Sequence, residues 1–184
     1  MPRITPIDPD NATGKSKELV DQVKEKLGTV PNILATMANS PAALGGYLSF
    51  SAALQNGNYD DGLREKIALK VSQKNNCSYC LAAHTTIGTM TGLDGETIKN
   101  ARKGTGADAK ENAILHFASR IVETKGFVSD EDSEAARKAG LNDADLAEIV
   151  ANVALTLYTN YFNHVADTEI DFPEAPALDC NCSG

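Results

Sequence analysis

Two cysteines and a histidine are spaced so that they can share one side of a single helix. They occur in the segment NCSYCLAAH, residues 76–84, which follows a polar break in the chain. At about 100° per residue, Cys80 lies about 60° and His84 about 20° from Cys77 around a helix axis. A Cys-x-x-Cys pair at a helix N-terminus favours thiol chemistry, because the helix dipole and the unpaired N–H groups stabilise a thiolate. The spacing therefore predicts a nucleophile, a base and a second thiol that closes a disulfide.

The residues leave open which thiol attacks first. Cys77 is closer to the helix terminus and gains most from the dipole, whereas His84 lies one turn beyond Cys80 and can take its proton directly or through a water. Tyr79 points away from this side, about 160° from Cys77 on the helical wheel. We still treat Tyr79 as a candidate lining residue of a cleft. His164, near the end of the helical body, is a second candidate, for which a structural hydrogen bond is the alternative.

Two further interpretations of the Cys-x-x-Cys pair remain. It can consist of two small buried residues without chemistry, or it can bind zinc together with His84 and a fourth ligand such as His164 or a tail cysteine. Three ligands on two turns of one helix are unusual for zinc, so we expect no metal. A second pair, Cys180 and Cys182, stands near the end of the chain. It is either two exposed thiols without a role or a tail redox pair that exchanges with an active-site disulfide.

The composition predicts a single all-helical domain. The chain has 184 residues, 42% of them hydrophobic, with no Trp, and all seven prolines lie outside residues 42–172. Proline is the residue that a helix interior tolerates least. The net charge of −8 argues against nucleic acid as a partner, because such binding depends on Lys and Arg replacing counterions. With no apolar run of about 18 residues and no apolar stretch near the start, we expect a cytoplasmic protein without signal peptide or membrane span.

Turn and cap signals divide the chain into segments. We predict an extended arm over residues 1–15, one helical domain over 16–172 and a tail over 173–184. Six glycines each follow a helix-favouring stretch, where a left-handed cap is expected: Gly28, Gly57, Gly92, Gly104, Gly126 and Gly140. The signals together predict helices at 16–27, 33–38, 42–56, 60–75, 77–91, 95–103, 108–125, 130–139 and 143–166.

Two helix starts and one helix face are predicted in more detail. Ser129 with Asp132, and Asn142 with Asp145, have the spacing of capping boxes with an acidic third position. In the final helix, apolar residues recur at steps of three and four and predict a side that faces the core. These residues are Leu146, Val150, Val153, Leu157 and Tyr161.

The reactive segment belongs to a longer pattern that starts at Glu65. Glu65, eleven residues, Cys77, two residues, Cys80, three residues and His84 resemble the signature of the alkylhydroperoxidase D-like (AhpD-like) proteins of the carboxymuconolactone decarboxylase superfamily. Four other segments resemble its peroxidase-related branch: VPN at 30–32, SP at 40–41, LRE at 63–65 and NYFNH at 160–164. Most of residues 27–173 is covered. The resemblance implies an all-α bundle of about eight to nine helices, with the Cys-x-x-Cys at the start of a central helix, and a homo-oligomer, often a trimer or hexamer.

The resemblance also implies roles for individual residues. Cys80 matches the thiol that attacks a peroxide, Cys77 the resolving thiol, and His84 with Glu65 the proton relay that activates Cys80. Tyr79 stands where some members have a histidine, so a second imidazole is missing there. Proteins of this kind reduce hydroperoxides and are regenerated by an external dithiol. A dihydrolipoyl protein is the implied donor, and a peroxiredoxin is a further candidate partner.

We therefore expect a cofactor-independent thiol peroxidase that serves antioxidant defence. No Gly-rich phosphate loop joined to a strand is present in the sequence, so we expect no bound flavin or nicotinamide. One alternative is a lyase similar to the decarboxylases that name the superfamily. The paired cysteines weigh against it, because proton transfer on a carboxylated lactone requires no dithiol that can close. The other alternative is a non-enzymatic redox-sensing or zinc-binding oligomeric module.

Overall fold

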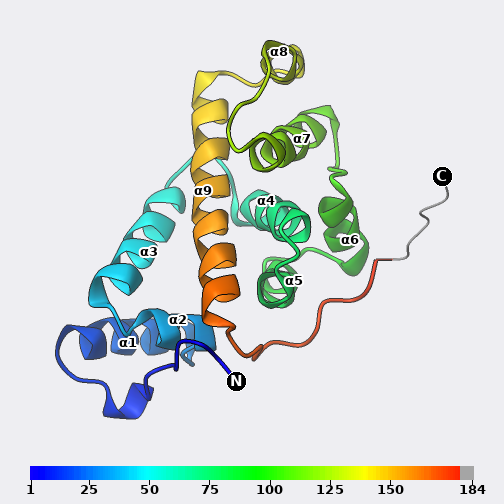
Figure 1. Cartoon of the computed structure of the whole chain (residues 1–184). Helices are drawn as coiled ribbons and strands as arrows, with labels where there is room; N and C mark the ends of the chain where they lie inside the picture. Colours follow the sequence, from blue (N-terminus) through cyan, green and yellow to red (C-terminus); the bar gives the residue numbers. More distant parts are fainter. Residues whose placement is uncertain (179–184) are drawn as a thin grey trace.

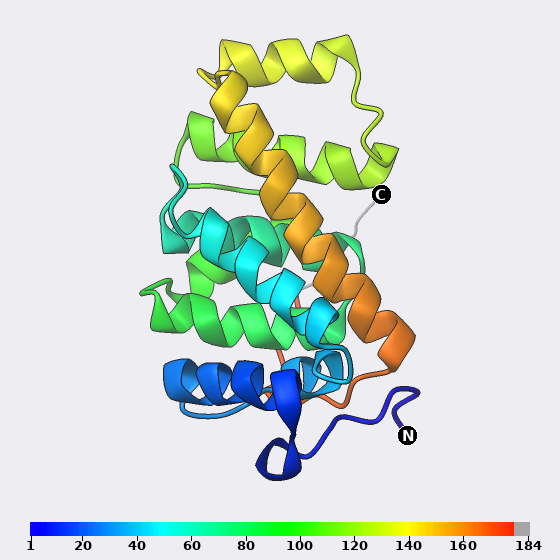
Figure 2. The same ribbon diagram turned by 90° about the vertical axis from the view of Figure 1, so that its left-hand side faces the viewer.

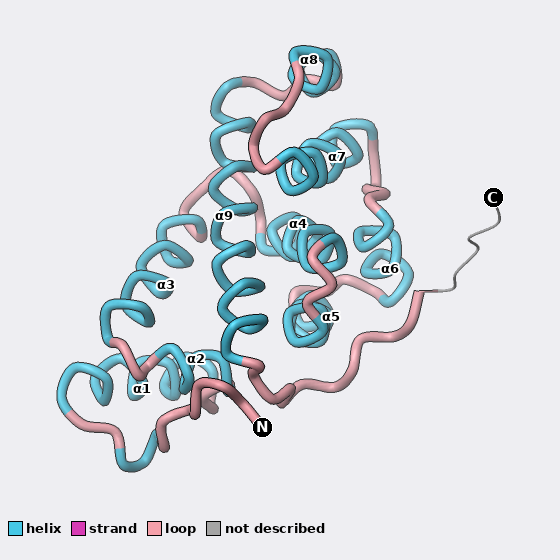
Figure 3. Tube along the Cα trace, viewed as in Figure 1, coloured by secondary structure: helices cyan, strands magenta, loops and turns pink. Residues whose placement is uncertain are grey.

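A computed structural model of the chain describes residues 1–178. This part folds into helices joined by loops and contains no strand (Figure 3). The predicted all-α class is therefore confirmed, and every predicted helix is present with ends that differ by at most two residues. None of the helices in residues 1–178 is long and apolar enough to cross a membrane. The elements are η1 (Pro9–Asn11), α1 (Gly14–Leu27), α2 (Asn32–Met37), α3 (Pro41–Leu54), α4 (Asp61–Lys74), α5 (Ser78–Met90), α6 (Gly95–Lys103), α7 (Ala109–Thr124), α8 (Asp130–Lys138) and α9 (Asp143–Ala166).

The longest helix, α9, runs along the length of the molecule. It has α4, α5, α6 and α7 on one side and α3 on the other, while α1 and α2 close the lower end (Figure 1). In the view turned by 90°, α9 and α3 lie in front of the stacked helices α7, α4 and α5 (Figure 2). Helix α4 is central, because it packs against α5, α6, α7 and α9. Helices α4 and α9 together therefore support α5, which carries the Cys-x-x-Cys segment.

Local capping fixes the helix ends that the sequence predicts. Both predicted capping boxes are present: the Ser129 side chain accepts the N–H of Asp132, the Asn142 side chain accepts that of Asp145, and each acidic side chain accepts in return. Five of the six glycines predicted as left-handed caps have positive φ, as predicted. These are Gly28, Gly92, Gly104, Gly126 and Gly140.

Gly57 is the exception, and the prediction of a left-handed cap is wrong there. Its φ is not positive, and its Cα lies against the carboxylate of Glu148. That carboxylate accepts the backbone N–H groups of Asn58 at 2.9 Å and Tyr59 at 3.0 Å. A Cβ at residue 57 would collide with the carboxylate. A larger residue would push this carboxylate away from the two N–H groups, so glycine is favoured here by a close approach from α9 rather than by the shape of the turn.

The predicted core-facing side of α9 is wrong in part. Val153 is fully buried, but Val150 is 50% and Tyr161 55% exposed. The side that faces the core is largely polar, and its buried members are Asp145, Ile149, Asn152, Val153, Thr156, Thr159, Asn160, Asn163 and Ala166. Hydrophobic periodicity assigns helix faces on the assumption that the core is apolar. Here buried polar side chains form hydrogen bonds to the helix backbone and to α4 and α5, which offset part of the cost of burying them.

The N-terminal arm, residues 1–13 in the structure, packs against the end of α9 and against α2. The N–H of Arg3 donates to the carbonyl of Ala166 at 2.7 Å, and that of Ile7 donates to the carbonyl of Ala35 at 3.1 Å. The arm also contains the short helix η1.

The segment after α9, residues 168–178, is called the C-terminal strap. It leaves α9 after Asp167, which has a left-handed conformation (φ 53°), and runs past α5 towards α6 (Figure 1). Near its end the guanidinium of Arg102 in α6 donates to the carbonyl of Pro176 at 2.5 Å. The last turn of α9 therefore holds the N-terminal arm and begins the strap.

Candidate active site

A tight turn between α4 and α5 places the two cysteines. Helix α4 ends at Lys74, and Asn76 then adopts a left-handed conformation (φ 53°), which Asn tolerates better than most residues. The N–H of Cys77 donates to the carbonyl of Ser72 at 3.0 Å, so the turn folds back on α4. Cys77 is thereby the N-cap of α5, and Cys80 lies in the first turn.

The two thiols are buried and adjacent. Cys77 is 1% and Cys80 2% exposed, both are free cysteines, and their Sγ atoms lie 2.6 Å apart. The Cys77 Sγ also accepts the backbone N–H of Cys80 at 3.4 Å. Because a disulfide bond is about 2.05 Å long, a small movement of the side chains is enough to close one.

Glu65 of α4 and His84 of α5 form a hydrogen-bonded pair. Glu65 Oε2 and His84 Nδ1 lie 2.7 Å apart, and the two side chains are 15% and 20% exposed. The contact forms because α4 and α5 pack directly on each other. When the carboxylate accepts the Nδ1–H, it selects the tautomer whose Nε2 is available for proton exchange. The structure thus brings together the two residues of the predicted relay.

The surroundings shift the pKa values of the two thiols in opposite directions. The hydrogen bond from the Cys77 thiol lowers the pKa of Cys80; burial opposes this shift, and the charge of His84 adds to it. The same bond, together with burial, raises the pKa of Cys77. Burial lowers the pKa of His84, but the Glu65 carboxylate and the Cys80 thiolate together raise it above its usual value. Cys80 is therefore the thiol that ionises first, with an imidazolium stabilised beside it.

Two further residues near the thiols escaped the sequence analysis. Asn163 of α9 donates from Nδ2 to the Sγ of Cys80 at 3.2 Å. Tyr47 of α3 is partly buried, and burial together with the nearby charges of Glu65 and Cys80 raises its pKa to about 12. A signal for Asn163 does exist: the buried polar residues of α9 recur at helical spacing. Nothing local distinguishes Tyr47, because α3 reaches the site only through tertiary packing.

The remaining predicted residues lie elsewhere. His164 is exposed on α9, where its ring tilts against that of Tyr161 with centroids 6.5 Å apart. It is the preceding residue, Asn163, that reaches Cys80. Cys180 and Cys182 lie outside the described residues, so the tail redox pair stays a prediction. Within residues 1–178, no three His, Cys, Asp or Glu side chains are grouped so that they could hold a metal ion.

Tyr79 fastens the C-terminal strap over the start of α5. Its hydroxyl donates to Asp171 Oδ1 at 2.7 Å and accepts the N–H of Ile33 at 3.2 Å, while its ring meets that of Phe172 edge-on at 5.7 Å. Asp171 Oδ2 accepts the N–H of Asn32 at 2.7 Å. Burial and the bond to Asp171 raise the pKa of Tyr79, so the hydroxyl keeps its proton. The tyrosine therefore joins the strap, α2 and α5 on the side of the core that contains the thiols.

Tyr79→Phe is expected to lower the free energy of unfolding by about 1–3 kcal/mol, because it removes a hydrogen bond to a carboxylate and leaves the Ile33 N–H without a partner. Urea unfolding measures this as a lower midpoint at unchanged slope. Tyr158→Phe is the matched control, since the exposed Tyr158 hydroxyl donates to the Ala43 carbonyl at 3.3 Å. The control is expected to change stability by less than about 0.5 kcal/mol. Equal effects of the two substitutions would contradict the importance of the strap contact.

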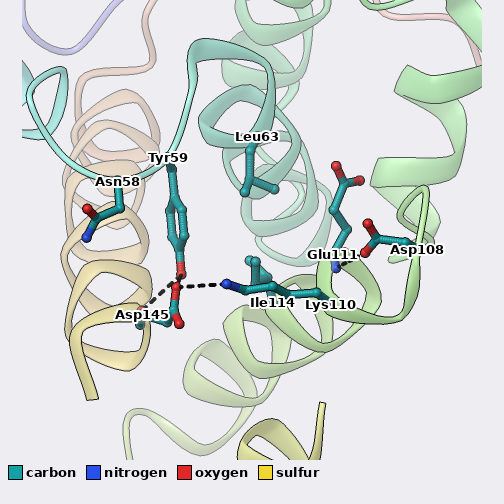
Figure 4. A pocket seen from close by; sticks show the side chains of 8 residues that line it. All are labelled: Asn58, Tyr59, Leu63, Asp108, Lys110, Glu111, Ile114 and Asp145. Carbon is teal, nitrogen blue, oxygen red and sulfur yellow. Dashed lines mark hydrogen bonds and ion pairs between the residues drawn. The ribbon is translucent and has the colours of Figure 1, made fainter. Parts of the chain in front are cut away.

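The cavity drawn in Figure 4 lies apart from the thiols, between the starts of α4, α7 and α9. It has a volume of about 220 Å³ and is lined by Asn58, Tyr59, Leu63, Asp108, Lys110, Glu111, Ile114 and Asp145. Several of its polar groups already have partners: the Tyr59 hydroxyl donates to the Asp145 carbonyl, Lys110 pairs with Asp145 at 3.4 Å, and Glu111 pairs with Lys66. No thiol or histidine lines it. We therefore assign the chemistry to the thiol pair and not to this cavity.

Comparisons with known proteins agree with this fold. Residues 41–123, which contain all four predicted catalytic residues, match the Carboxymuconolactone decarboxylase family. No curated protein matches the chain. Among solved structures, an uncharacterized peroxidase-related protein with an alkylhydroperoxidase AhpD core from Ralstonia eutropha JMP134 is similar, with a TM-score of 0.81, 23% identity and 92% of each chain covered.

Two other solved structures have the same fold. An uncharacterized peroxidase-related protein from Silicibacter sp. TM1040 has a TM-score of 0.77 and 24% identity, over 91% of this chain and 92% of the other. A variant of the debrominase Bmp8 in complex with 2,3,4-tribromopyrrole has a TM-score of 0.78 and 20% identity, over 92% of this chain and 91% of the other. Residues 41–123 are therefore similar to the Carboxymuconolactone decarboxylase family, and the shared architecture shows that the chain has an AhpD-like fold.

Proposed function

We propose that the chain is a thiol-dependent peroxidase and disulfide oxidoreductase that reduces alkyl hydroperoxides in antioxidant defence. The observation that carries the proposal is the adjacent thiol pair, in which Cys80 has a lowered pKa while Cys77 stays protonated. The hydrogen-bonded pair of Glu65 and His84 adds a proton donor. A nucleophile, a resolving thiol and an acid–base group are the parts that peroxide reduction by a dithiol requires.

In the first step, the Cys80 thiolate attacks the terminal oxygen of the hydroperoxide. A sulfur–oxygen bond forms as the oxygen–oxygen bond breaks, and the His84 imidazolium gives a proton to the leaving alkoxide. The products are the Cys80 sulfenic acid and an alcohol, so sulfur loses the two electrons that the peroxide gains. The Glu65 carboxylate stabilises the imidazolium until it transfers its proton.

In the second step, the Cys77 sulfur attacks the sulfur of the Cys80 sulfenic acid. Water leaves, and the Cys77–Cys80 disulfide remains. An external dithiol then reduces the disulfide; we propose a dihydrolipoyl protein or a similar donor, with a peroxiredoxin as a further partner. Cys180 and Cys182 are proposed as an internal exchange pair.

The proposal includes the compartment and the assembly. Dithiol donors are kept reduced in the cytoplasm, and we place the protein there. We also propose a homo-oligomer, a trimer or a hexamer. Its support is the outer side of α9, where Val150, Tyr158, Tyr161 and Val165 are exposed, since apolar side chains gathered on a surface are typical of contact regions.

Mass spectrometry after one equivalent of cumene hydroperoxide tests the proposal. We expect a Cys77–Cys80 disulfide within seconds, and a peptide map of the same sample detects any mixed disulfide with Cys180 or Cys182. Met90 is an internal control, because it is 81% exposed and reports indiscriminate oxidation. Oxidised Met90 with both thiols unchanged would contradict a peroxidase.

Reductive removal of bromine from a bromopyrrole is a second candidate function. The debrominase Bmp8 shares the fold, and a thiol pair that closes to a disulfide supplies the two electrons that this reaction needs. The balanced reaction turns two thiols and an aryl bromide into a disulfide, the debrominated ring and hydrogen bromide. Bromide release from 2,3,4-tribromopyrrole, compared with alcohol release from cumene hydroperoxide, decides between the two acceptors.

The lyase and the non-enzymatic module have less support. A decarboxylating lyase does not explain why two buried thiols are placed side by side. A zinc-binding module would need a third ligand next to the thiols, and within residues 1–178 no three His, Cys, Asp or Glu side chains are grouped so that they could hold a metal ion. Metal analysis of the purified protein separates the zinc-binding module from dithiol chemistry.

A further inference from the structure

The side-chain amide of Asn163 is held against the reactive sulfur with one of its two ends in use. Nδ2 donates to the Sγ of Cys80 at 3.2 Å, and the residue is 5% exposed. Oδ1 is buried and accepts no hydrogen bond from any residue in the described part of the chain. A buried carbonyl oxygen without a donor is costly, so such an atom normally has a partner in the functioning protein.

The neighbouring residue Asn160 shows what a fully paired amide on the same face of α9 looks like. Its Oδ1 accepts from Asn75 Nδ2 at 2.8 Å, and its Nδ2 donates to Ser72 Oγ at 3.2 Å. These bonds tie α9 to the end of α4 one turn before Asn163. The rotation of α9 at the thiols is therefore fixed, and Asn163 presents its unpaired oxygen from a braced position.

We propose that Asn163 is a catalytic residue that holds the Cys80 thiolate through Nδ2 and accepts a hydrogen bond from the substrate O–H through Oδ1. The proposal rests on the proposed peroxidase function and deepens it. The chemistry of Oδ1 indicates the class of substrate. Oδ1 can only accept a hydrogen bond, so the oxidising substrate that pairs with it carries an O–H or N–H group next to the atom that the thiolate attacks. A hydroperoxide has its hydroxyl hydrogen on the oxygen that the thiolate attacks.

The chemistry keeps that hydrogen in place throughout the step. The Cys80 sulfur forms a bond to the terminal oxygen, the oxygen–oxygen bond breaks, and the alkoxide takes its proton from His84. The hydroxyl hydrogen bound to Asn163 stays on the transferred oxygen and becomes the hydrogen of the sulfenic acid. The amide therefore orients the substrate before attack and supports the sulfenic acid until Cys77 displaces water.

Asn163→Leu replaces both polar ends of the amide by methyl groups on the same branched frame, and Asn152→Leu is the matched control. Asn152 is 5% exposed on the same face of α9, donates within the helix to the Glu148 carbonyl, and lies eleven residues earlier. At 1.5 Å per residue it is about 16 Å from Asn163 along the helix. Two measurements are made on each protein: titration of the thiolate by its ultraviolet absorbance, and the rate of cumene hydroperoxide reduction at a pH where the Cys80 thiol is fully ionised.

For Asn163→Leu we expect the thiol pKa to rise by about one unit, since a hydrogen bond to a charged group is lost. The rate of the fully ionised enzyme is expected to fall about tenfold or more. An unchanged titration relative to Asn152→Leu would overturn the role of Nδ2, and an unchanged limiting rate would overturn the role of Oδ1. If Asn163→Leu does not fold, Asn163→Ala is measured in the same way.

The two proposals fail separately in this design. If the unsubstituted protein does not reduce hydroperoxide, the peroxidase function and the substrate contact of Oδ1 are overturned together. The titration uses no substrate, so it still decides whether Asn163 stabilises the Cys80 thiolate. A shifted titration with no peroxide turnover would keep the donor role and reject the peroxidase function.

Discussion

Cys80→Ser is expected to lower hydroperoxide consumption more than about a thousandfold, because a serine hydroxyl at neutral pH is not ionised and cannot replace a thiolate nucleophile. Stopped-flow kinetics with cumene hydroperoxide measures the loss. The fold should persist, since the two side chains differ by one atom and Cys77 still caps α5 through the Cys80 position's backbone N–H. Ser78→Ala, an exposed site between the two cysteines, is the control and should leave the rate unchanged.

Cys77→Ser is expected to behave differently from Cys80→Ser. The Cys80 thiol should still react once, and the sulfenic acid should accumulate because no resolving thiol remains. Trapping with dimedone would then label Cys80 in this variant and not in the unsubstituted protein. Turnover that survives Cys80→Ser and is lost in Cys77→Ser would reverse the roles of the two thiols.

Glu65→Gln is expected to lower kcat/KM for hydroperoxide by about a hundredfold to ten-thousandfold, the usual contribution of a positioned acid–base group. Glutamine keeps the shape of the side chain but loses its charge, so the His84 pKa falls, since the carboxylate raises it in the intact pair. Because His84 is then protonated in a smaller fraction of the molecules, its positive charge stabilises the Cys80 thiolate less, and the pKa of the Cys80 thiol rises.

The pH profile of Glu65→Gln gives the sharper measurement. Activity requires an ionised Cys80 and a protonated His84, so the acid limb reports the thiol and the alkaline limb reports the imidazole. The substitution should move the acid limb to higher pH and the alkaline limb to lower pH, so the pH range of activity becomes narrower from both sides. Glu111→Gln is the control, because it breaks a half-buried ion pair with Lys66 away from the thiols. A profile that narrows equally in the control would assign the effect to general destabilisation.

The helices could be predicted because their boundaries are local. Proline is confined to the two ends of the chain, and residues such as Asn142 and Gly104 cap helices through contacts within a few residues. The orientation of α9 could not be predicted in the same way. Its apolar residues predict a buried side, but Asn160 and Asn163 are buried instead because α4 and α5 offer them hydrogen-bond partners. Those partners are more than eighty residues away in sequence.

In the site, too, features that depend on local sequence could be predicted, and features that depend on tertiary packing could not. The four residues from Glu65 to His84 stand out by type and spacing, because a single helix and its predecessor position them. Tyr47 and Asp171 come from α3 and the C-terminal strap, and their approach depends on tertiary packing that leaves no periodic trace in the chain. Asn163 is intermediate, since polar residues recurring along a helix are visible in sequence but their meaning depends on which side is buried.

The two sides of α9 have different roles: one side forms hydrogen bonds at the thiols, and the other forms an exposed apolar surface. Its inward side supplies amides to the sulfur and to α4, while its outward side presents valine and tyrosine to the surroundings. Substitutions on the outward side can alter how strongly this surface associates with other molecules, while the hydrogen bonds at the thiols stay intact. Substitution of Asn163 on the inward side is expected to change the reactivity of the sulfur and to leave that surface unchanged. The association of the outer surface and the reactivity of the Cys80 thiol can therefore be engineered independently within one helix.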